Sequence, residues 1–145
     1  MTKKEILFVC TGNTCRSPMA AALACKMFDS VSASSAGMAA DMSAAASFGA
    51  RAAMLSEGID ISGHFPRQVD LQMMEHADIV LAMAAHHKKS LCAMFFAQAK
   101  KIHTLGDYAG GNFAGLDVSD PYGMDLNFYL ECAALLKAML GACEF

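Results

Sequence analysis

The sequence predicts a single α/β domain, spanning residues 1–145, in which a four-stranded parallel sheet is covered by helices on both faces. Its length suits one domain with a proper core, and no repeat, low-complexity tract or linker divides it. Hydrophobic residues make up 55% of the chain and charged residues 17%, which is typical of a compact globular protein. Short apolar runs alternate with segments of helical character, and such an alternation calls for a parallel sheet with right-handed crossovers.

The elements follow from this pattern in chain order. The expected strands are the short apolar runs at residues 6–9, 31–35, 79–83 and 101–104. The expected helices cover residues 18–28, 43–56, 70–76, 86–97 and 125–140. Gly58 should end the second helix. The last helix carries an apolar stripe that comprises Leu126, Tyr129, Leu130, Ala133, Leu136 and Leu140. Residues 106–123 are rich in glycine and are expected to form a loop too long to be only a connection.

Residues 6–19 combine a buried strand, a tight loop and the start of a helix. Gly12 and Asn13 can both adopt the positive φ that a tight turn needs. Ser17 is expected to cap the following helix, with Pro18 at its first position. This arrangement gathers backbone N–H groups around a concavity and points a helix dipole into it, which suits an anion such as phosphate.

Two side chains of this segment predict a reactive site. Cys10 follows the strand, where the helix dipole and Arg16 both favour its thiolate. Arg16 can grip two phosphate oxygens with its planar guanidinium group. The spacing of the two residues is a weak pattern by itself, because a cysteine at a strand end is usually a small core residue. The strand, turn and helix signals around it favour a phosphoryl-transfer site with a cysteine nucleophile.

A cysteine phosphatase also needs a carboxylic acid that protonates the leaving group and then activates water. The glycine-rich loop follows the fourth strand and therefore emerges at the same edge of the sheet as Cys10. Asp120 is the best candidate, because Pro121 stiffens the chain and favours an extended conformation at the preceding residue. Asp107 and Asp117 remain possible.

Composition excludes several other classes. The net charge of −3 and the lack of a Lys/Arg cluster argue against a nucleic-acid partner. No apolar run is long enough to span a membrane, and the N-terminal run is too short for a secretion signal. Six cysteines without framework spacing indicate reduced thiols and a cytoplasmic location. Cys10 and Cys15 lack a second ligand pair, so a zinc site is not expected.

Residues 9–20 (VCTGNTCRSPMA) resemble the signature of the low-molecular-weight protein tyrosine phosphatases. Further markers occur in family order at residues 35–37 (SAG), 58–64 (GIDISGH), 77–83 (ADIVLAM) and 119–123 (SDPYG). The resemblance spans essentially the whole chain. It implies a flavodoxin-like fold of three layers, α/β/α, with a phosphate loop between the first strand and the first helix. It also implies phosphorylated proteins as substrates, phosphate or other oxyanions in the loop, and no cofactor or metal.

The resemblance assigns roles as well. Cys10 would form a phosphocysteine intermediate, Arg16 would clamp the phosphate, and Asp120 would act as general acid and then base. The phosphate-binding loop would comprise Thr11, Gly12, Asn13, Thr14, Cys15 and Ser17. Ser17 would donate a hydrogen bond to the Cys10 thiolate. His64 would support Asn13, which holds the loop, although on chemistry alone it is a turn histidine. Cys15 would form a disulfide with Cys10 under oxidation, or be a plain packing residue.

The substrate depends on Thr14 and Tyr122. Tyrosine phosphatases of the family usually carry an aliphatic residue two positions before the arginine, whereas the bacterial protein-arginine phosphatases have threonine, as here. A phosphotyrosine ring favours apolar walls, yet residues 38–47 contain no aromatic and Gly123 stands where many tyrosine enzymes have one. Tyr122 itself is usual in the tyrosine group. We therefore expect phosphoarginine to be preferred, with phosphotyrosine as the alternative.

Two remoter classes stay open. An arsenate reductase would need a relay of neighbouring thiols, and Cys92, Cys132 and Cys143 are widely spaced. A phosphate-binding or redox-sensing module without turnover would not need Asp120 beside Cys10 and Arg16.

Overall fold

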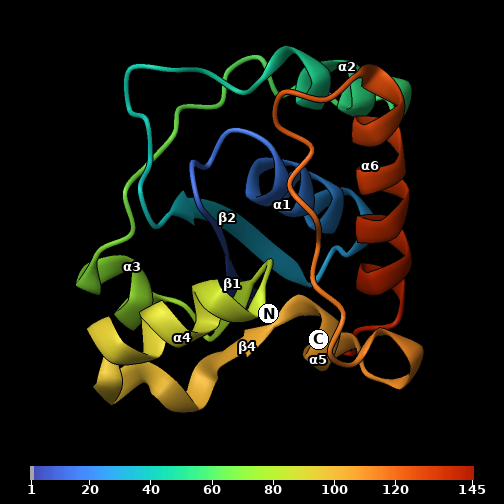
Figure 1. Ribbon diagram of the computed structural model, residues 1–145. Coiled ribbons are helices and arrows are strands. Elements are labelled where there is room, and N and C mark those ends of the chain that lie inside the picture. The colour runs from blue at the N-terminus through green and yellow to red at the C-terminus, as the bar shows by residue number, and fades with distance from the viewer. Residues whose placement is uncertain (1) are drawn as a thin grey trace.

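The computed structural model describes residues 2–145 and contains a four-stranded parallel sheet (Figure 1). Its strands are β1 (Lys4–Cys10), β2 (Val31–Gly37), β3 (Ile79–Ala82) and β4 (Ile102–Thr104). They lie in the order β2-β1-β3-β4, and each neighbouring pair is parallel. The predicted fold class is confirmed, and the predicted strands differ only at their ends.

Helices cover both faces of the sheet, as predicted. One layer comprises α1 (Arg16–Met27), α2 (Phe48–Ser56), α5 (Leu105–Ala109) and α6 (Leu126–Gly141). The other comprises α3 (Leu71–His76) and α4 (Ala85–Met94), and short 3₁₀ helices η1 and η2 cover Phe96–Lys101 and Gly111–Phe113.

The side chains of β1 alternate between the two cores. Ile6, Phe8 and Cys10 belong to the core under α1 and α6, whereas Leu7 and Val9 belong to the core under α3 and α4. This period of two follows from the pleat of a strand. It places the Cys10 side chain on the face of the sheet that α1 covers.

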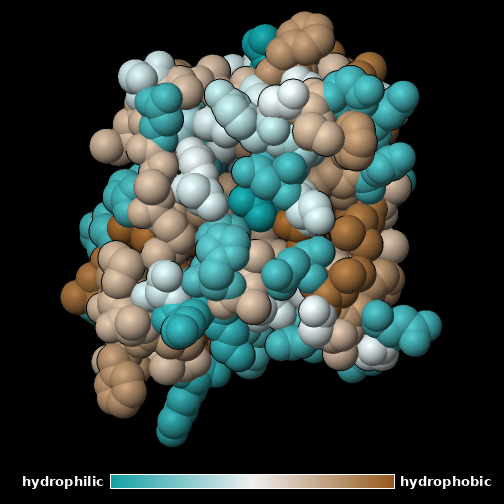
Figure 2. All heavy atoms as spheres, viewed as in Figure 1, coloured by the Kyte–Doolittle hydropathy of each residue, from teal (hydrophilic) through white to brown (hydrophobic). Residues whose placement is uncertain are grey.

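The carboxyl ends of the strands carry the predicted site. Cys10 ends β1 and pairs with Gly37, the last residue of β2. The segment after η2 returns to this edge, where the Val118 amide donates to Met83 O over 2.8 Å. Ligands of open parallel sheets bind at this edge. Figure 2 shows polar residues gathered in the middle of the corresponding face, with hydrophobic surface beside them over α6.

The start of α1 differs from the prediction. The helix begins at Arg16, with Cys15 at the N-cap position and no side-chain cap. Ser17 therefore lies in the first turn and is not the cap. Its hydroxyl contacts the Cys10 sulfur instead, at 2.8 Å.

Other boundaries also differ. The helix predicted over residues 43–56 begins only at Phe48, because Ser47 caps it by accepting a hydrogen bond from Ala50 N. Gly58 follows the end of α2 with a φ of 75°, as expected for a residue that ends a helix. The glycine-rich segment is not a plain loop, since α5 and η2 lie within it.

The remaining corrections concern α4 and α6. The helix predicted over residues 86–97 ends at Met94, and η1 follows it. In α6 four residues of the predicted stripe are buried, namely Tyr129, Ala133, Leu136 and Leu140, but Leu126 and Leu130 are 47% and 37% exposed. Among residues 2–145, no helix combines the length and hydrophobicity that crossing a membrane requires.

Candidate active site

The loop from Cys10 to Arg16 is held in shape by the buried side chain of Asn13. This residue has a φ of 58°, whereas Gly12 does not adopt the positive φ that the sequence allowed it. The Asn13 amide nitrogen donates to Ser17 Oγ and Ser35 Oγ over 2.8 and 2.9 Å. Its side-chain oxygen accepts from the Arg67 amide over 2.9 Å. These bonds compensate for the strain of a left-handed conformation in a residue with a Cβ atom.

Two further residues support the loop from outside. His64 Nε2 lies 2.7 Å from Asn13 O, which is the contact that the family resemblance implies. A Cβ atom at Gly37 would come within 2.6 Å of Thr11 O. Only glycine therefore lets the end of β2 approach the loop this closely, and the next two amides, of Met38 and Ala39, donate to Cys10 O and Thr11 O.

Cys10 lies at the bottom of the loop and is 2% exposed. Its sulfur is 2.8 Å from Ser17 Oγ. Asn13 donates to that same oxygen, so the hydroxyl of Ser17 is itself a donor. Of its two possible acceptors, the Cys10 sulfur is nearer than Ala36 O, which lies at 3.4 Å. The uncapped N-terminus of α1 adds free backbone N–H groups at the same place. A thiolate, and an anion bound in front of it, would both be stabilised here.

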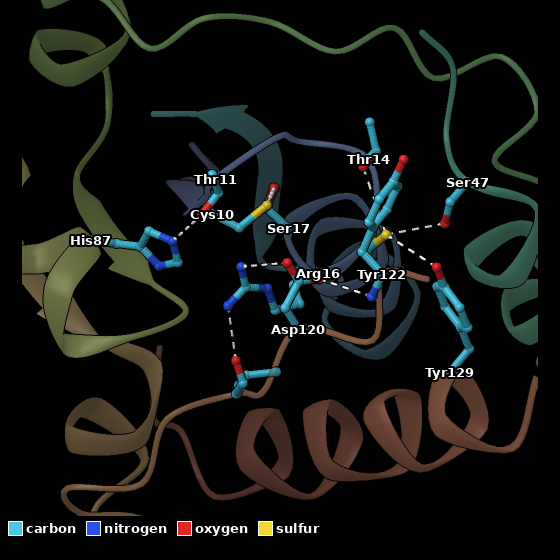
Figure 3. A network of polar contacts seen from close by, with 12 residues as sticks. Cys10, Thr11, Thr14, Arg16, Ser17, Ser47, His87, Asp120, Tyr122 and Tyr129 are labelled. Carbon is cyan, nitrogen blue, oxygen red and sulfur yellow. Dashed lines mark hydrogen bonds and ion pairs between the residues drawn. The ribbon is translucent and has the colours of Figure 1, made fainter. Parts of the chain in front are cut away.

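Arg16 and Asp120 meet at the opposite side of the cavity (Figure 3). The Arg16 side chain is buried, and its Nη1 donates to Val118 O over 3.0 Å. Its Nη2 lies 3.5 Å from Asp120 Oδ2. The Asp120 side chain is 50% exposed, and its other oxygen accepts from the Tyr122 amide. This carboxyl group is therefore held near the guanidinium group and is open to substrate.

The two other candidate acids lie elsewhere. Asp117 Oδ1 accepts from the Ala85 amide over 2.9 Å, at the start of α4. Asp107 Oδ1 accepts from the Gly115 amide over 2.8 Å, within its own segment. Neither lines the cavity that contains Cys10.

That cavity has a volume of about 420 Å³, which is enough for one phosphorylated side chain. It is lined by the loop and by two facing segments: Cys10, Thr11, Gly12, Thr14, Cys15, Arg16, Asp41, Ala44, Ala45, Ser47, Asp120 and Tyr122. The structure thus brings Cys10, Arg16 and Asp120 together with Thr14 and Tyr122. His64 lies behind the loop and does not reach the cavity.

Cys15 is 4% exposed and lies on the side of the loop that faces α6. Its sulfur contacts Ser47 Oγ at 3.1 Å and the Tyr129 hydroxyl at 3.6 Å. Burial raises the pKa of Tyr129, so its hydroxyl stays protonated and can donate. Burial also raises the pKa of Cys132, a neighbouring thiol on α6, to about 12. This protonated thiol is unsuited to the relay that an arsenate reductase would need.

His87 is a residue of the site that the sequence did not reveal. It is 1% exposed, and its Nε2 lies 2.8 Å from Thr11 Oγ1 (Figure 3). Burial, and after it the positive charge of Arg16, lowers the pKa of His87 to about 4. The imidazole is therefore neutral at physiological pH. No sequence pattern predicts that a histidine at the start of a helix will contact the loop. The only indication is that His87 closely follows the carboxyl end of a predicted strand.

The arrangement has the parts of a phosphoryl-transfer site. Among residues 2–145, no group of three or more His, Cys, Asp or Glu side chains is placed to hold a metal ion. A nucleophilic sulfur, an anion cradle, a guanidinium group and a carboxyl group all face one cavity. Such a set can transfer a phosphoryl group to sulfur and then to water.

Comparison with known proteins agrees with this chemistry. The family described as low molecular weight phosphotyrosine protein phosphatase matches residues 5–143. The protein-arginine-phosphatase of Bacillus subtilis (strain 168) is 36% identical over 140 residues, covering 94% of this chain and 91% of the relative. The low molecular weight protein-tyrosine-phosphatase Ptp of Acinetobacter johnsonii is 31% identical over 137 residues, covering 94% and 93%.

A solved structure has a similar fold. It is a mutant of the YwlE arginine phosphatase with a phosphorylated active-site serine. It superposes on this chain with a TM-score of 0.89 and is 34% identical to it in sequence, with 95% of this chain and 91% of that chain covered.

Proposed function

This chain belongs to the low molecular weight phosphotyrosine protein phosphatase family, and from that premise we propose that it hydrolyses phosphoarginine in proteins through a phosphocysteine intermediate. The observation that carries the chemistry is the shared cavity of Cys10, Arg16 and Asp120. Phosphotyrosine is the second candidate substrate, since family members with that activity are also similar to this chain.

The first step transfers the phosphoryl group to sulfur. The Cys10 thiolate attacks phosphorus, and the bond from phosphorus to the guanidinium nitrogen breaks. Asp120 gives its proton to that nitrogen, and Arg16 with the loop amides holds the phosphoryl oxygens. Support comes from the YwlE mutant, because a phosphorylated serine in that active site is the oxygen counterpart of phosphocysteine.

The second step releases phosphate. Asp120, now ionised, takes a proton from a water molecule, whose oxygen attacks phosphorus. The phosphorus–sulfur bond breaks, and the thiolate returns to the hydrogen bond of Ser17. The products are inorganic phosphate and the starting enzyme.

Three features of the cavity support arginine over tyrosine as the side chain. Thr14 presents a hydroxyl at the rim, and Ala44 and Ala45 form a small wall where a ring would gain little contact. Asp41 also lines the cavity, and hydrogen bonds from Ser43 lower the pKa of its carboxyl group. This carboxylate and Asp120 suit a planar, polar guanidinium group better than a phenyl ring.

The replacement Thr14→Ile should shift the substrate preference. The two side chains are both β-branched and close in volume, so the loop should keep its fold. A hydroxyl that contacts the guanidinium group is lost, and a polar contact is worth about 0.5–1.5 kcal/mol or more when a partner is left unpaired. The ratio of kcat/KM values for phosphoarginine and phosphotyrosine peptides should therefore move by roughly 10-fold or more towards phosphotyrosine.

Thr14→Ser is the matched control, because it retains the hydroxyl and should retain the wild-type ratio. An aryl phosphate, which tests only the shared chemistry, should be hydrolysed by all three proteins. If the wild type prefers phosphotyrosine and Thr14→Ile leaves the ratio unchanged, the tyrosine alternative replaces our proposal.

Mild peroxide should inactivate the enzyme reversibly. The thiolate form of Cys10 would be oxidised to a sulfenic acid, and the Cys15 thiol would displace water from it to form a disulfide. Both residues line one cavity, which supports this pairing. Peptide mapping without reductant should find the Cys10–Cys15 bridge, and Cys15→Ser should instead be inactivated irreversibly. Over-oxidised Cys10 beside a free Cys15 in the wild type would contradict it.

A further inference from the structure

The start of α4 is tied to both sides of the phosphate cavity. His87 contacts Thr11 on the loop, at 2.8 Å. Two residues earlier, the Ala85 amide donates to Asp117. The next residue, Val118, accepts a hydrogen bond from Arg16 through its carbonyl oxygen. The side chain of His87 is thus a fixed neighbour of the loop, although it does not itself line the cavity.

The tautomer of this histidine decides whether the Thr11 hydroxyl can donate a hydrogen bond towards the cavity or can only accept one. The hydroxyl of Thr11 has one hydrogen, and Thr11 is one of the residues that line the cavity. If His87 accepted that hydrogen, Thr11 would present only lone pairs to the cavity and would repel an oxyanion. If Nε2 carries the hydrogen and donates to Thr11 Oγ1, the hydroxyl hydrogen of Thr11 remains free to donate to a phosphoryl oxygen.

The environment of the ring favours the second state. Nδ1 is buried and has no hydrogen-bond partner among the described residues. A buried N–H group without an acceptor is rarer than an unused acceptor, so the hydrogen belongs on Nε2. The charged and titratable groups around the ring are Arg16 from α1, His86 on α4 itself, and Asp117 and Asp120 from the segment before α6. Burial and Arg16 keep the ring neutral.

We propose that His87 is a positioning residue of the phosphate site: its Nε2–H group donates to Thr11 Oγ1 and so turns the Thr11 hydroxyl into a hydrogen-bond donor for the bound phosphoryl group. The inference rests on the proposed function only in that the loop binds a phosphoryl group. It gives Thr11 a side-chain role besides that of its backbone in the loop.

The test compares two replacements of similar polarity and different reach. His87→Gln places an amide nitrogen near the position of Nε2, whereas the shorter His87→Asn reaches only about as far as Nδ1. The measured quantity is the Kd for inorganic phosphate, obtained by calorimetry on the full chain, together with kcat/KM on an aryl phosphate. We expect His87→Asn to weaken phosphate binding about 10- to 100-fold, as for one hydrogen bond to a charged group, and His87→Gln to restore most of it.

Thr11 variants separate positioning from general support of the fold. Thr11→Val should weaken phosphate binding as much as His87→Asn, and Thr11→Ser should bind like the wild type. The double variant Thr11→Val/His87→Asn should bind phosphate no more weakly than whichever single variant has the higher Kd, because both replacements remove the same hydrogen-bond donor. Lys89→Gln, at an exposed position of the same helix, is the control and should behave like the wild type.

Independent, multiplied losses in the double variant would overturn the proposal, as would wild-type phosphate binding by Thr11→Val or equal binding by His87→Asn and His87→Gln. A wild type that does not bind phosphate would overturn it too. A wild type that binds phosphate but hydrolyses no phosphorylated peptide would sink the proposed function, while the binding comparison would still decide the role of His87.

Discussion

Replacing Cys10 with serine should abolish turnover and leave oxyanion binding in place. A serine hydroxyl is not ionised at neutral pH, and its neighbour at this position is the Ser17 hydroxyl, which is not a base. Removal of a nucleophile can cost up to about 10⁶ in rate, so we expect a loss of at least about 10⁴-fold in kcat. The cradle of loop amides and Arg16 is unchanged, and phosphate should still bind.

The measurements are aryl phosphate hydrolysis and phosphate affinity by calorimetry. Cys25→Ser is the matched control, because Cys25 is an exposed thiol on α1 whose sulfur donates to Ala33 O and does not line the cavity. It should retain wild-type activity. Turnover within 10-fold of the wild type in Cys10→Ser would rule out Cys10 as the nucleophile. Loss of phosphate binding would instead indicate that the loop had not kept its shape.

The second large effect is expected for Asp120→Ala. Without a proton donor, the leaving atom departs with an uncompensated charge, and the water of the second step loses its base. General acid–base groups typically contribute 10²–10⁴-fold, so kcat should fall by roughly that factor. The loss should be largest for substrates with poor leaving groups. A series of aryl phosphates with leaving groups of different basicity measures this dependence.

Asp107→Asn is the control for this experiment. Asp107 lies in the same glycine-rich segment, but its carboxylate holds the Gly115 amide and does not face the cavity. Asp107→Asn should retain activity within about 3-fold of the wild type, because a substitution at the surface usually has a small effect. If Asp107→Asn or Asp117→Asn loses as much as Asp120→Ala, or if the loss does not depend on the leaving group, another acid serves the reaction.

The sequence alone could not decide which of three aspartates lies near Arg16. The residue before a proline was favoured for its conformation, but Asp107 and Asp117 could not be excluded. Each proved to hold a backbone amide elsewhere, and only Asp120 approaches Arg16. The path of residues 106–123 depends on α5 and η2, which were expected to be loop.

Patterns of neighbouring residues in the sequence were sufficient to predict the sheet and the phosphate-binding loop. The strands and the Cys10–Arg16 loop could be predicted because hydrophobic period and turn residues act between near neighbours in the chain. The helix start was misplaced by two residues for the opposite reason. Ser17 would cap a helix in isolation, but the fold uses its hydroxyl for the Cys10 sulfur.

The sequence by itself determined the α/β class, the order of the elements, and the loop that carries Cys10 and Arg16, since all of these are encoded in contiguous residues. Only the tertiary structure decided which carboxyl group faces Arg16, that Ser35 and Arg67 hold Asn13, and that His87 contacts Thr11 from 76 residues away. The physical reason is the parallel sheet. Each crossover returns a distant strand end to the same edge, so the partners that complete the site are neighbours in space with no periodicity in the chain to reveal them.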